Sequence, residues 1–186
     1  MKASKKEYGG YSLKSAFQNQ EKLKKREILL YGVVLFCFAG LMSVTITPIE
    51  NLLVSPISEL INQRTPDYFD WTNTELTRSY TKGILAFTSI VFLIMNSFAG
   101  PIIEELFFRG YLTSKLERLQ WKAPVVITIL FSLYHLWQPF GNLFRTMTFG
   151  VVALIVYRKR NIYISMVFHC LCNLLTTVNF LVAWWL

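Results

Sequence analysis

The chain alternates between long uncharged runs and short charged segments. The first uncharged run covers 28–46, about the length that an α-helix needs to cross roughly 30 Å of hydrocarbon. A second begins at Gly83 and continues without a charge to Ile103. Uncharged runs of this length predict membrane-spanning helices.

Three further apolar runs follow, at 123–137, 140–157 and 162–186. The last of them ends in Trp184 and Trp185, which are typical of a membrane interface. We therefore predict an all-α fold, a polytopic transmembrane helical bundle with about five to six spans.

The run that starts at Gly83 continues into a charged motif and is too long for one straight span. Gly100 and Pro101 predict a break, because proline lacks an N–H and clashes with the preceding helical turn. The segments 51–61 and 83–99 each leave open an additional crossing or a re-entrant element.

Composition and charge agree with a membrane protein. Hydrophobic residues make up 53% of the chain and charged residues 16%, and the mean hydropathy is +0.39; a soluble domain carries about a quarter charged residues. Much of the net charge of +8 lies in residues 1–27, which read as a mobile or surface-lying tail. Beside a span, such a tail indicates membrane orientation and attraction to lipid headgroups, and no nucleic-acid partner is expected.

The basic residues also predict a topology in the cell membrane. Cytoplasmic loops carry an excess of Lys and Arg, which places the N-terminus and the loops near Lys115 and Arg158 in the cytoplasm; Arg145 is an exception at the outer end of its run. The predicted parts are a basic cytoplasmic tail at 1–27, a first transmembrane helix with an extracytoplasmic segment at 28–82, and a membrane core at 83–186.

Two neighbouring glutamates lie at the end of an apolar run. A charge near the bilayer centre costs from ~3 to more than 10 kcal/mol, so it needs a partner or a polar cavity. Glu105 and Arg109 are four residues apart in the favourable acid-first order, and we expect a structural salt bridge. Glu104 points about 100° away on a helix and has no local partner, so it can act as a base toward water.

Both histidines of the chain lie in predicted spans. His169 and Asn173 are four residues apart and share one helical face, and His135 lies in an earlier run. With Glu104 they supply a base, imidazoles that hold water or stabilise charge, and a carboxamide donor for an oxyanion. Residue types alone leave open both a catalytic site and a proton or ion pathway.

The three cysteines do not predict a metal site. They lie in apolar runs without a CxxC pair, at Cys37, Cys170 and Cys172. Adjacent helix positions point about 100° apart, and cysteine is common in buried helices. We therefore expect neither a disulfide nor metal ligation by these cysteines.

Three motifs together resemble the CAAX-protease and bacteriocin-processing family of membrane proteases, also called the abortive-infection family. They are Glu-Glu-x-x-x-Arg at 104–109, Phe-x-x-x-His at 131–135 and His-x-x-x-Asn at 169–173. Their order and rough spacing agree with the family, and the resemblance covers about residues 83–180.

The resemblance implies an intramembrane endopeptidase. It implies that Glu104 activates the hydrolytic water together with His135, and that His169 and Asn173 bind the developing oxyanion. It implies a supporting role for Glu105 and Arg109. Family members have been described both as metalloproteases and as metal-independent glutamate proteases, so a divalent metal such as zinc is a possible cofactor. No HExxH occurs and asparagine is a poor zinc ligand, so we expect no obligatory metal.

The expected partners are the lipid bilayer and a peptide or membrane-protein substrate. Members of the prenyl-protease type have more helices than the five or six that this chain supports, which favours peptide maturation or bacteriocin self-immunity over CAAX-type processing. One alternative is a non-catalytic membrane immunity or scaffold protein that retains the motifs as a buried polar network. Another is a small proton-coupled transporter, although the sequence shows no internal repeat.

Overall fold

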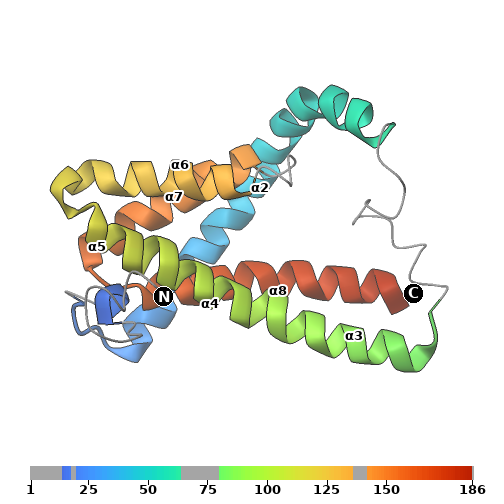
Figure 1. The fold of residues 1–186 in the computed structure, drawn as a ribbon, viewed down its shortest axis with the longest axis horizontal. Helices are drawn as coiled ribbons and strands as arrows, with labels where there is room; N and C mark the ends of the chain where they lie inside the picture. Colours follow the sequence, from blue (N-terminus) through green and yellow to red (C-terminus); the bar gives the residue numbers. More distant parts are fainter. Residues whose placement is uncertain (1–13, 18–19, 64–79, 136–141, 186) are drawn as a thin grey trace.

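The computed structural model describes residues 14–17, 20–63, 80–135 and 142–185 (Figure 1). All regular elements within these ranges are helices, which confirms the predicted all-α class. The elements are η1 (Lys14–Phe17), α2 (Lys25–Asn62), α3 (Lys82–Ile94), η4 (Met95–Ala99), α4 (Gly100–Glu105), η5 (Leu106–Leu112), α5 (Thr113–Lys115), η6 (Glu117–Lys122), α6 (Ala123–Tyr134), α7 (Asn142–Lys159) and α8 (Tyr163–Trp185).

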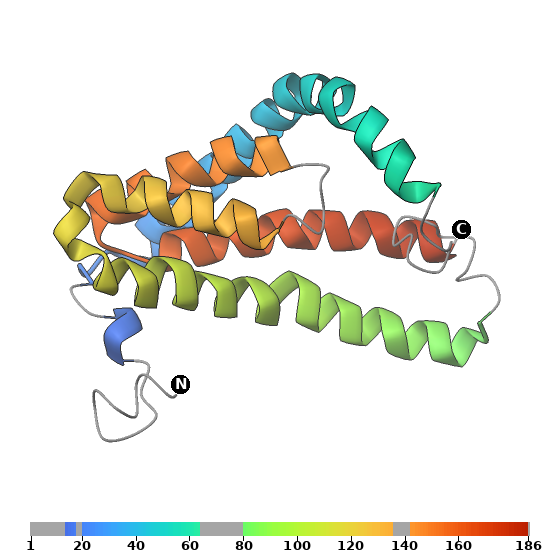
Figure 2. The same cartoon turned by 45° about the horizontal axis from the view of Figure 1, so that its top comes forward.

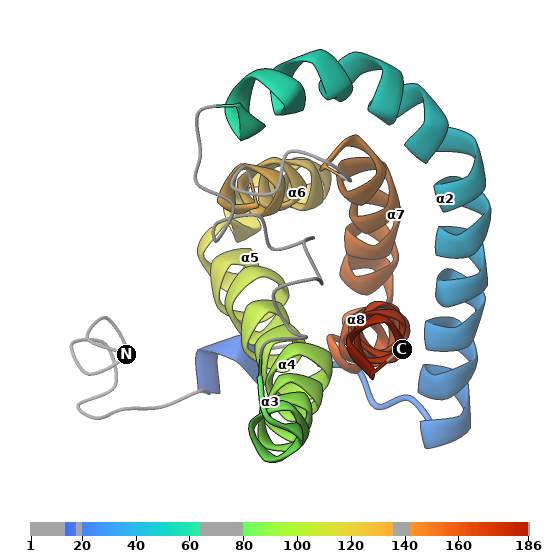
Figure 3. The same cartoon turned by 90° about the vertical axis from the view of Figure 1, so that its right-hand side faces the viewer.

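These helices form one bundle. The elements from α3 to α5 follow one another end to end, and α8 lies beside them (Figures 1 and 2). Helices α6 and α7 pack together as an antiparallel pair. Helix α2 packs against α8 and α7, and its later part curves over α7 and α6, as Figure 3 shows.

Three helical stretches in the described part of the chain are long and apolar enough to cross a membrane. They are Lys25–Pro56, Lys82–Lys115 and Tyr163–Trp185. The chain is therefore a multi-pass membrane protein. Helices α6 and α7 are shorter, with 12 and 18 residues. The total of five to six spans stays a prediction. Residues 64–79, part of the predicted extracytoplasmic segment, and residues 136–141, between two predicted apolar runs, lie outside the described residues.

Apolar side chains on the outside and polar ones inside fit a hydrocarbon surrounding. Leu30, Val44 and Phe87 are 61%, 76% and 70% exposed, whereas Glu105 and Arg109 are 0% and 3% exposed. In lipid, exposed apolar side chains carry no penalty and charged ones must face the interior of the bundle. The long helices therefore present apolar faces outward, and the charged groups lie in the interior together with a core of apolar side chains such as Phe131 and Phe168.

The first helix is longer than the sequence predicted. The expected span ended at residue 46, but α2 continues through Pro48 and Pro56 to Asn62. Each proline removes one intrahelical hydrogen bond and bends the helix without ending it. This curvature brings Glu50, expected in an extracytoplasmic segment, against the start of α7.

The predicted break at Gly100 and Pro101 is a π-helical turn instead of an interruption. In η4 the N–H of Gly100 donates to the carbonyl of Met95, five residues earlier. In that register the carbonyl of Asn96 would accept from residue 101, but Pro101 has no N–H to give. The helix therefore continues through the proline and leaves one backbone carbonyl without a helical donor.

Part of the N-terminal segment is packed against the bundle. Ala16 is 3% exposed, and a side chain on Gly110 would meet its backbone oxygen at 2.8 Å. The side-chain oxygen of Gln20 accepts from Ile162 N at 2.8 Å, and Glu21 N donates to the Arg160 carbonyl at 2.8 Å. The expectation of a mobile or surface-lying tail is therefore wrong for these residues.

Candidate active site

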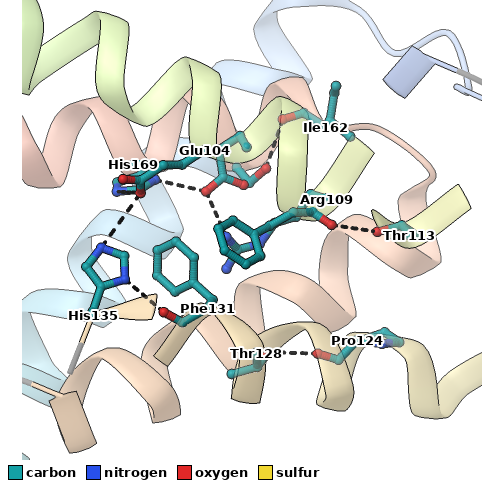
Figure 4. A network of polar contacts seen from close by, with 12 residues as sticks. Glu104, Arg109, Thr113, Pro124, Thr128, Phe131, His135, Ile162 and His169 are labelled. Carbon is teal, nitrogen blue, oxygen red and sulfur yellow. Dashed lines mark hydrogen bonds and ion pairs between the residues drawn. The ribbon is translucent and has the colours of Figure 1, made fainter. Parts of the chain in front are cut away.

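Four of the residues singled out in the sequence come from three different helices. Glu104 lies near the end of α4, His135 caps the C-terminus of α6, and His169 and Asn173 lie on α8. The structure brings the first three together: Glu104 Oε2 is 3.8 Å from His135 Nε2 and 3.9 Å from His169 Nε2 (Figure 4).

The spacing of this cluster suits a bridging water molecule. Distances of 3.8 and 3.9 Å exceed those of a direct hydrogen bond, and polar atoms at such a spacing are commonly joined through water. The Glu104 side chain is 22% exposed, whereas the side chains of His135 and His169 are 11% and 5% exposed. The carboxylate is thus the most accessible member of the cluster.

The orientation of His135 is set by its own helix. Its Nδ1 lies 2.8 Å from the backbone oxygen of Phe131. A carbonyl only accepts, so Nδ1 carries the hydrogen, and in the neutral ring Nε2 is an acceptor directed at Glu104. The Phe131 ring lies 4.5 Å from the imidazole, centroid to centroid, and supports this position.

Glu105 holds both Arg109 and His169. Its Oε1 accepts from Arg109 Nη1 at 3.1 Å and lies 2.9 Å from His169 Nδ1. The salt bridge expected from the four-residue spacing is therefore confirmed. The histidine contact was not anticipated, because 64 residues separate the two partners. It directs His169 Nε2 toward Glu104, as a carboxylate behind a functional histidine commonly does.

The guanidinium of Arg109 is stabilised by aromatic rings as well as by Glu105. Its Cζ lies 4.3 Å from the Phe131 ring centroid and 5.0 Å from that of Phe149. A cation over an aromatic face gains electrostatic stabilisation that increases with desolvation. Arg109 is therefore a structural support behind the two histidines (Figure 4).

Asn173 occupies the expected face of α8, but its described hydrogen bond goes to η4. Its Nδ2 donates to the Asn96 carbonyl at 2.9 Å, which is the carbonyl that Pro101 leaves without a helical donor. The Asn96 side chain in turn donates to Thr177 Oγ1 at 2.8 Å. Motif reasoning missed Asn96 and Thr177; their polarity within apolar runs was the available signal.

A further acid, Glu50 of α2, and a further cation, Arg145 of α7, lie at the start of α7. Glu50 is 1% exposed and accepts from Leu143 N at 2.8 Å and from Phe144 N at 3.1 Å. It thereby caps the first turn of α7, whose own donors have no intrahelical partners. Arg145, on the same turn, interacts electrostatically with both Glu50 and Glu104.

The side chains present do not form a metal centre. In the part of the chain that the structure describes, no group of three or more His, Cys, Asp and Glu residues is arranged to hold a metal ion. A zinc site needs donor atoms about 2.0–2.2 Å from one point, commonly four of them. Here the Asn173 amide is bonded to the Asn96 carbonyl, and asparagine is a poor zinc ligand, so the motif residues do not supply a fourth zinc ligand.

Residues 86–175 match the family model of the type II CAAX prenyl endopeptidase Rce1-like proteins. This segment is similar to the Rce1-like family. The matched range contains Glu104, His135, His169 and Asn173, and the resemblance stated from the three motifs is confirmed. The Rce1-like match supports a CAAX-type intramembrane protease in general, with a peptide or protein substrate in a membrane. No curated protein and no solved structure matches the chain.

Proposed function

We propose that this protein is an intramembrane endopeptidase that hydrolyses peptide bonds with a water molecule activated by Glu104. The observation that carries the proposal is the position of Glu104 Oε2, 3.8 and 3.9 Å from the Nε2 atoms of two buried histidines, within the Rce1-like segment. A carboxylate next to two imidazoles in the interior of a helical bundle can accept a proton from a bound water molecule.

In the first step Glu104 takes a proton from water while the water oxygen attacks the carbonyl carbon of the scissile bond. His135 accepts a second hydrogen bond from this water through Nε2, because its Nδ1 hydrogen is used by the Phe131 carbonyl. The carboxylate and the imidazole thus orient the attacking oxygen without a metal ion.

The negative charge that develops on the substrate oxygen needs donors. His169 in its protonated form donates from Nε2, and Glu105, bonded to Nδ1 at 2.9 Å, stabilises the imidazolium charge. Asn173 is a second donor, since an amide nitrogen carries two hydrogens and only one is used by Asn96. Glu104 then returns its proton to the leaving amine nitrogen as the C–N bond breaks, giving an acid and an amine.

The proposed substrates are peptides or membrane-associated proteins, in peptide maturation, CAAX-type processing or bacteriocin self-immunity. The proposed location is the cell membrane with the N-terminus in the cytoplasm. The starts of α2, α6 and α8 and the ends of α5 and α7 lie at one end of the bundle (Figure 1), where the basic residues near Lys25, Lys115 and Arg158 gather. Hereafter this is called the basic end.

A comparison of peptide termini in cells that carry the wild type or Glu104→Gln tests the proposal. We expect termini that are present with the wild type and with Glu59→Gln, an exposed glutamate on α2, to disappear with Glu104→Gln at matched expression. Identical peptide profiles for all three forms would overturn the proposal. They would favour instead the non-catalytic scaffold, in which the buried contacts of Glu105 only specify helix packing.

A further inference from the structure

A cavity of about 470 Å³ lies at the basic end of the bundle. It borders η5, the continuation of the helix that carries Glu104, but Glu104 does not line it. It is enclosed by η5, α5, the starts of α6 and α8, the end of α7 and the N-terminal segment, which meet at one end of the bundle in Figures 1 and 2. Glu104, His135 and His169 do not line it. The cavity therefore does not include the proposed reacting groups, although Arg109 of the supporting pair lies in its wall.

The lining combines cations, hydroxyl groups and an apolar surface. Exposed Arg158 and Arg160 lie on it together with the hydroxyl-bearing Thr113 and Ser114, and Glu117 is the acidic residue of the lining. The apolar part is contributed by Pro124, Ile127, Ala153, Val156 and Ile162. Guanidinium groups are donors that proteins use for phosphate oxygens. The hydroxyls of Thr113 and Ser114 already donate to the carbonyls of Phe108 and Tyr111 at 3.2 and 2.7 Å, so the arginines are the donors of this lining.

A buried arginine also lines this cavity. Arg109 is 3% exposed and gives Nη1 to Glu105, but its Nε and Nη2 have no hydrogen-bond partner within the protein. Buried donors without a partner are costly, so such groups commonly serve a ligand or an ordered water molecule. Both nitrogen atoms are buried, so they do not by themselves indicate a ligand in the cavity.

The wall that carries the exposed arginines is held in place by the N-terminal segment. Arg160 has a φ of 44°, an unfavourable conformation for a residue with a side chain, and its carbonyl accepts from Glu21 N. Asn161 Nδ2 donates to the Glu21 carbonyl at 2.9 Å, and Ile162 N donates to Gln20 at 2.8 Å. A wall fixed by three hydrogen bonds is preorganised for a ligand.

We propose that this cavity binds a phosphate-bearing anion at the basic end of the bundle. The volume falls within the range of small-ligand sites, roughly 300–1,000 Å³. Basic pockets between transmembrane helices on the cytoplasmic side bind anionic lipid headgroups. The apolar lining provides a surface for the carbon chain next to the phosphate of a lipid, and a free phosphate would use the arginines alone.

Native mass spectrometry of the purified full-length protein tests this site without reference to its catalytic activity. The probes are phosphatidylglycerol, zwitterionic phosphatidylcholine and inorganic phosphate, each added separately. The test variant is Arg158→Gln with Arg160→Gln. The control is Arg118→Gln with Lys122→Gln, which removes the same charge from the same end at exposed residues that do not line the cavity.

We expect phosphatidylglycerol to bind the test variant about a hundredfold more weakly than the wild type or the control, since two arginines are replaced and each lost charge-assisted hydrogen bond is worth about a factor of ten. Binding of inorganic phosphate with the same variant dependence, but not of phosphatidylglycerol, would support the anion site and assign it to a soluble phosphate. Three results would overturn the proposal: phosphatidylglycerol binding that falls equally in the test and control variants, phosphatidylcholine that binds the wild type as well as phosphatidylglycerol does, or no binding of any probe. If the double variant does not fold, Arg158→Gln alone is compared with Arg118→Gln.

Discussion

Asn173 on α8 donates its side-chain amide to the backbone carbonyl of Asn96 in η4, at 2.9 Å. The π-helical register directs the Gly100 N–H to Met95, and Pro101 offers no N–H, so this carbonyl depends on a donor from another helix. Pro101 thus creates the free carbonyl at Asn96, and Asn173 of the His-x-x-x-Asn motif supplies its donor.

This relationship predicts a coupling between two substitutions. Asn173→Ala should lower the free energy of unfolding by about 1–3 kcal/mol, because the Asn96 carbonyl loses its donor. In a Pro101→Ala background the cost should fall toward zero, since residue 101 then supplies an N–H. A double-mutant cycle of unfolding in mixed micelles measures the coupling.

The exposed Asn179 on the same helix provides the control, because Asn179→Ala should cost little in either background. An Asn173→Ala cost that is the same with and without Pro101 would show that the carbonyl does not depend on this amide.

The buried pair of Glu105 and Arg109 predicts strong non-additivity. Glu105→Gln should destabilise the protein by about 3–5 kcal/mol, because it leaves the Arg109 charge buried without its counter-ion. Combining it with Arg109→Gln should cost less than the sum of the single substitutions. Thermal unfolding of the single and double variants measures both effects, with Glu59→Gln as the exposed control. Simple additivity would contradict a mutually neutralising pair.

Glu50 is predicted to hold the first turn of α7. Glu50→Ala should cost about 1–2 kcal/mol, the value of a helix N-cap, and should speed hydrogen exchange at Leu143 and Phe144. Glu59→Ala, on the exposed part of the same helix, should change neither quantity. Unchanged exchange at the start of α7 in Glu50→Ala would show that the cap is dispensable.

Metal removal is predicted to leave cleavage intact. The Asn173 amide, a poor zinc ligand, is engaged with the Asn96 carbonyl, so the motif residues leave a zinc site without a fourth ligand. Once Glu104-dependent cleavage is established, the protein is dialysed against a strong chelator and assayed again. Loss of activity that added zinc restores would contradict the metal-independent route.

The sequence by itself determined the membrane class, the helical runs and the residues of the three motifs. It also determined the pair of Glu105 and Arg109, because residues four apart on a helix are neighbours whatever surrounds them. Local geometry was sufficient for each of these predictions, and the Rce1-like match covers the same motifs.

The tertiary structure alone decided which helix faces meet. The contacts of His169 with Glu105, of Asn173 with Asn96 and of Glu50 with the start of α7 join residues 64, 77 and 93 positions apart. In a bilayer both the outer and the inner faces of a helix can be apolar, so hydropathy does not reveal which face is buried or in which register two helices pack. The packing of the helices, rather than the pattern along the chain, therefore directs the two histidines at Glu104.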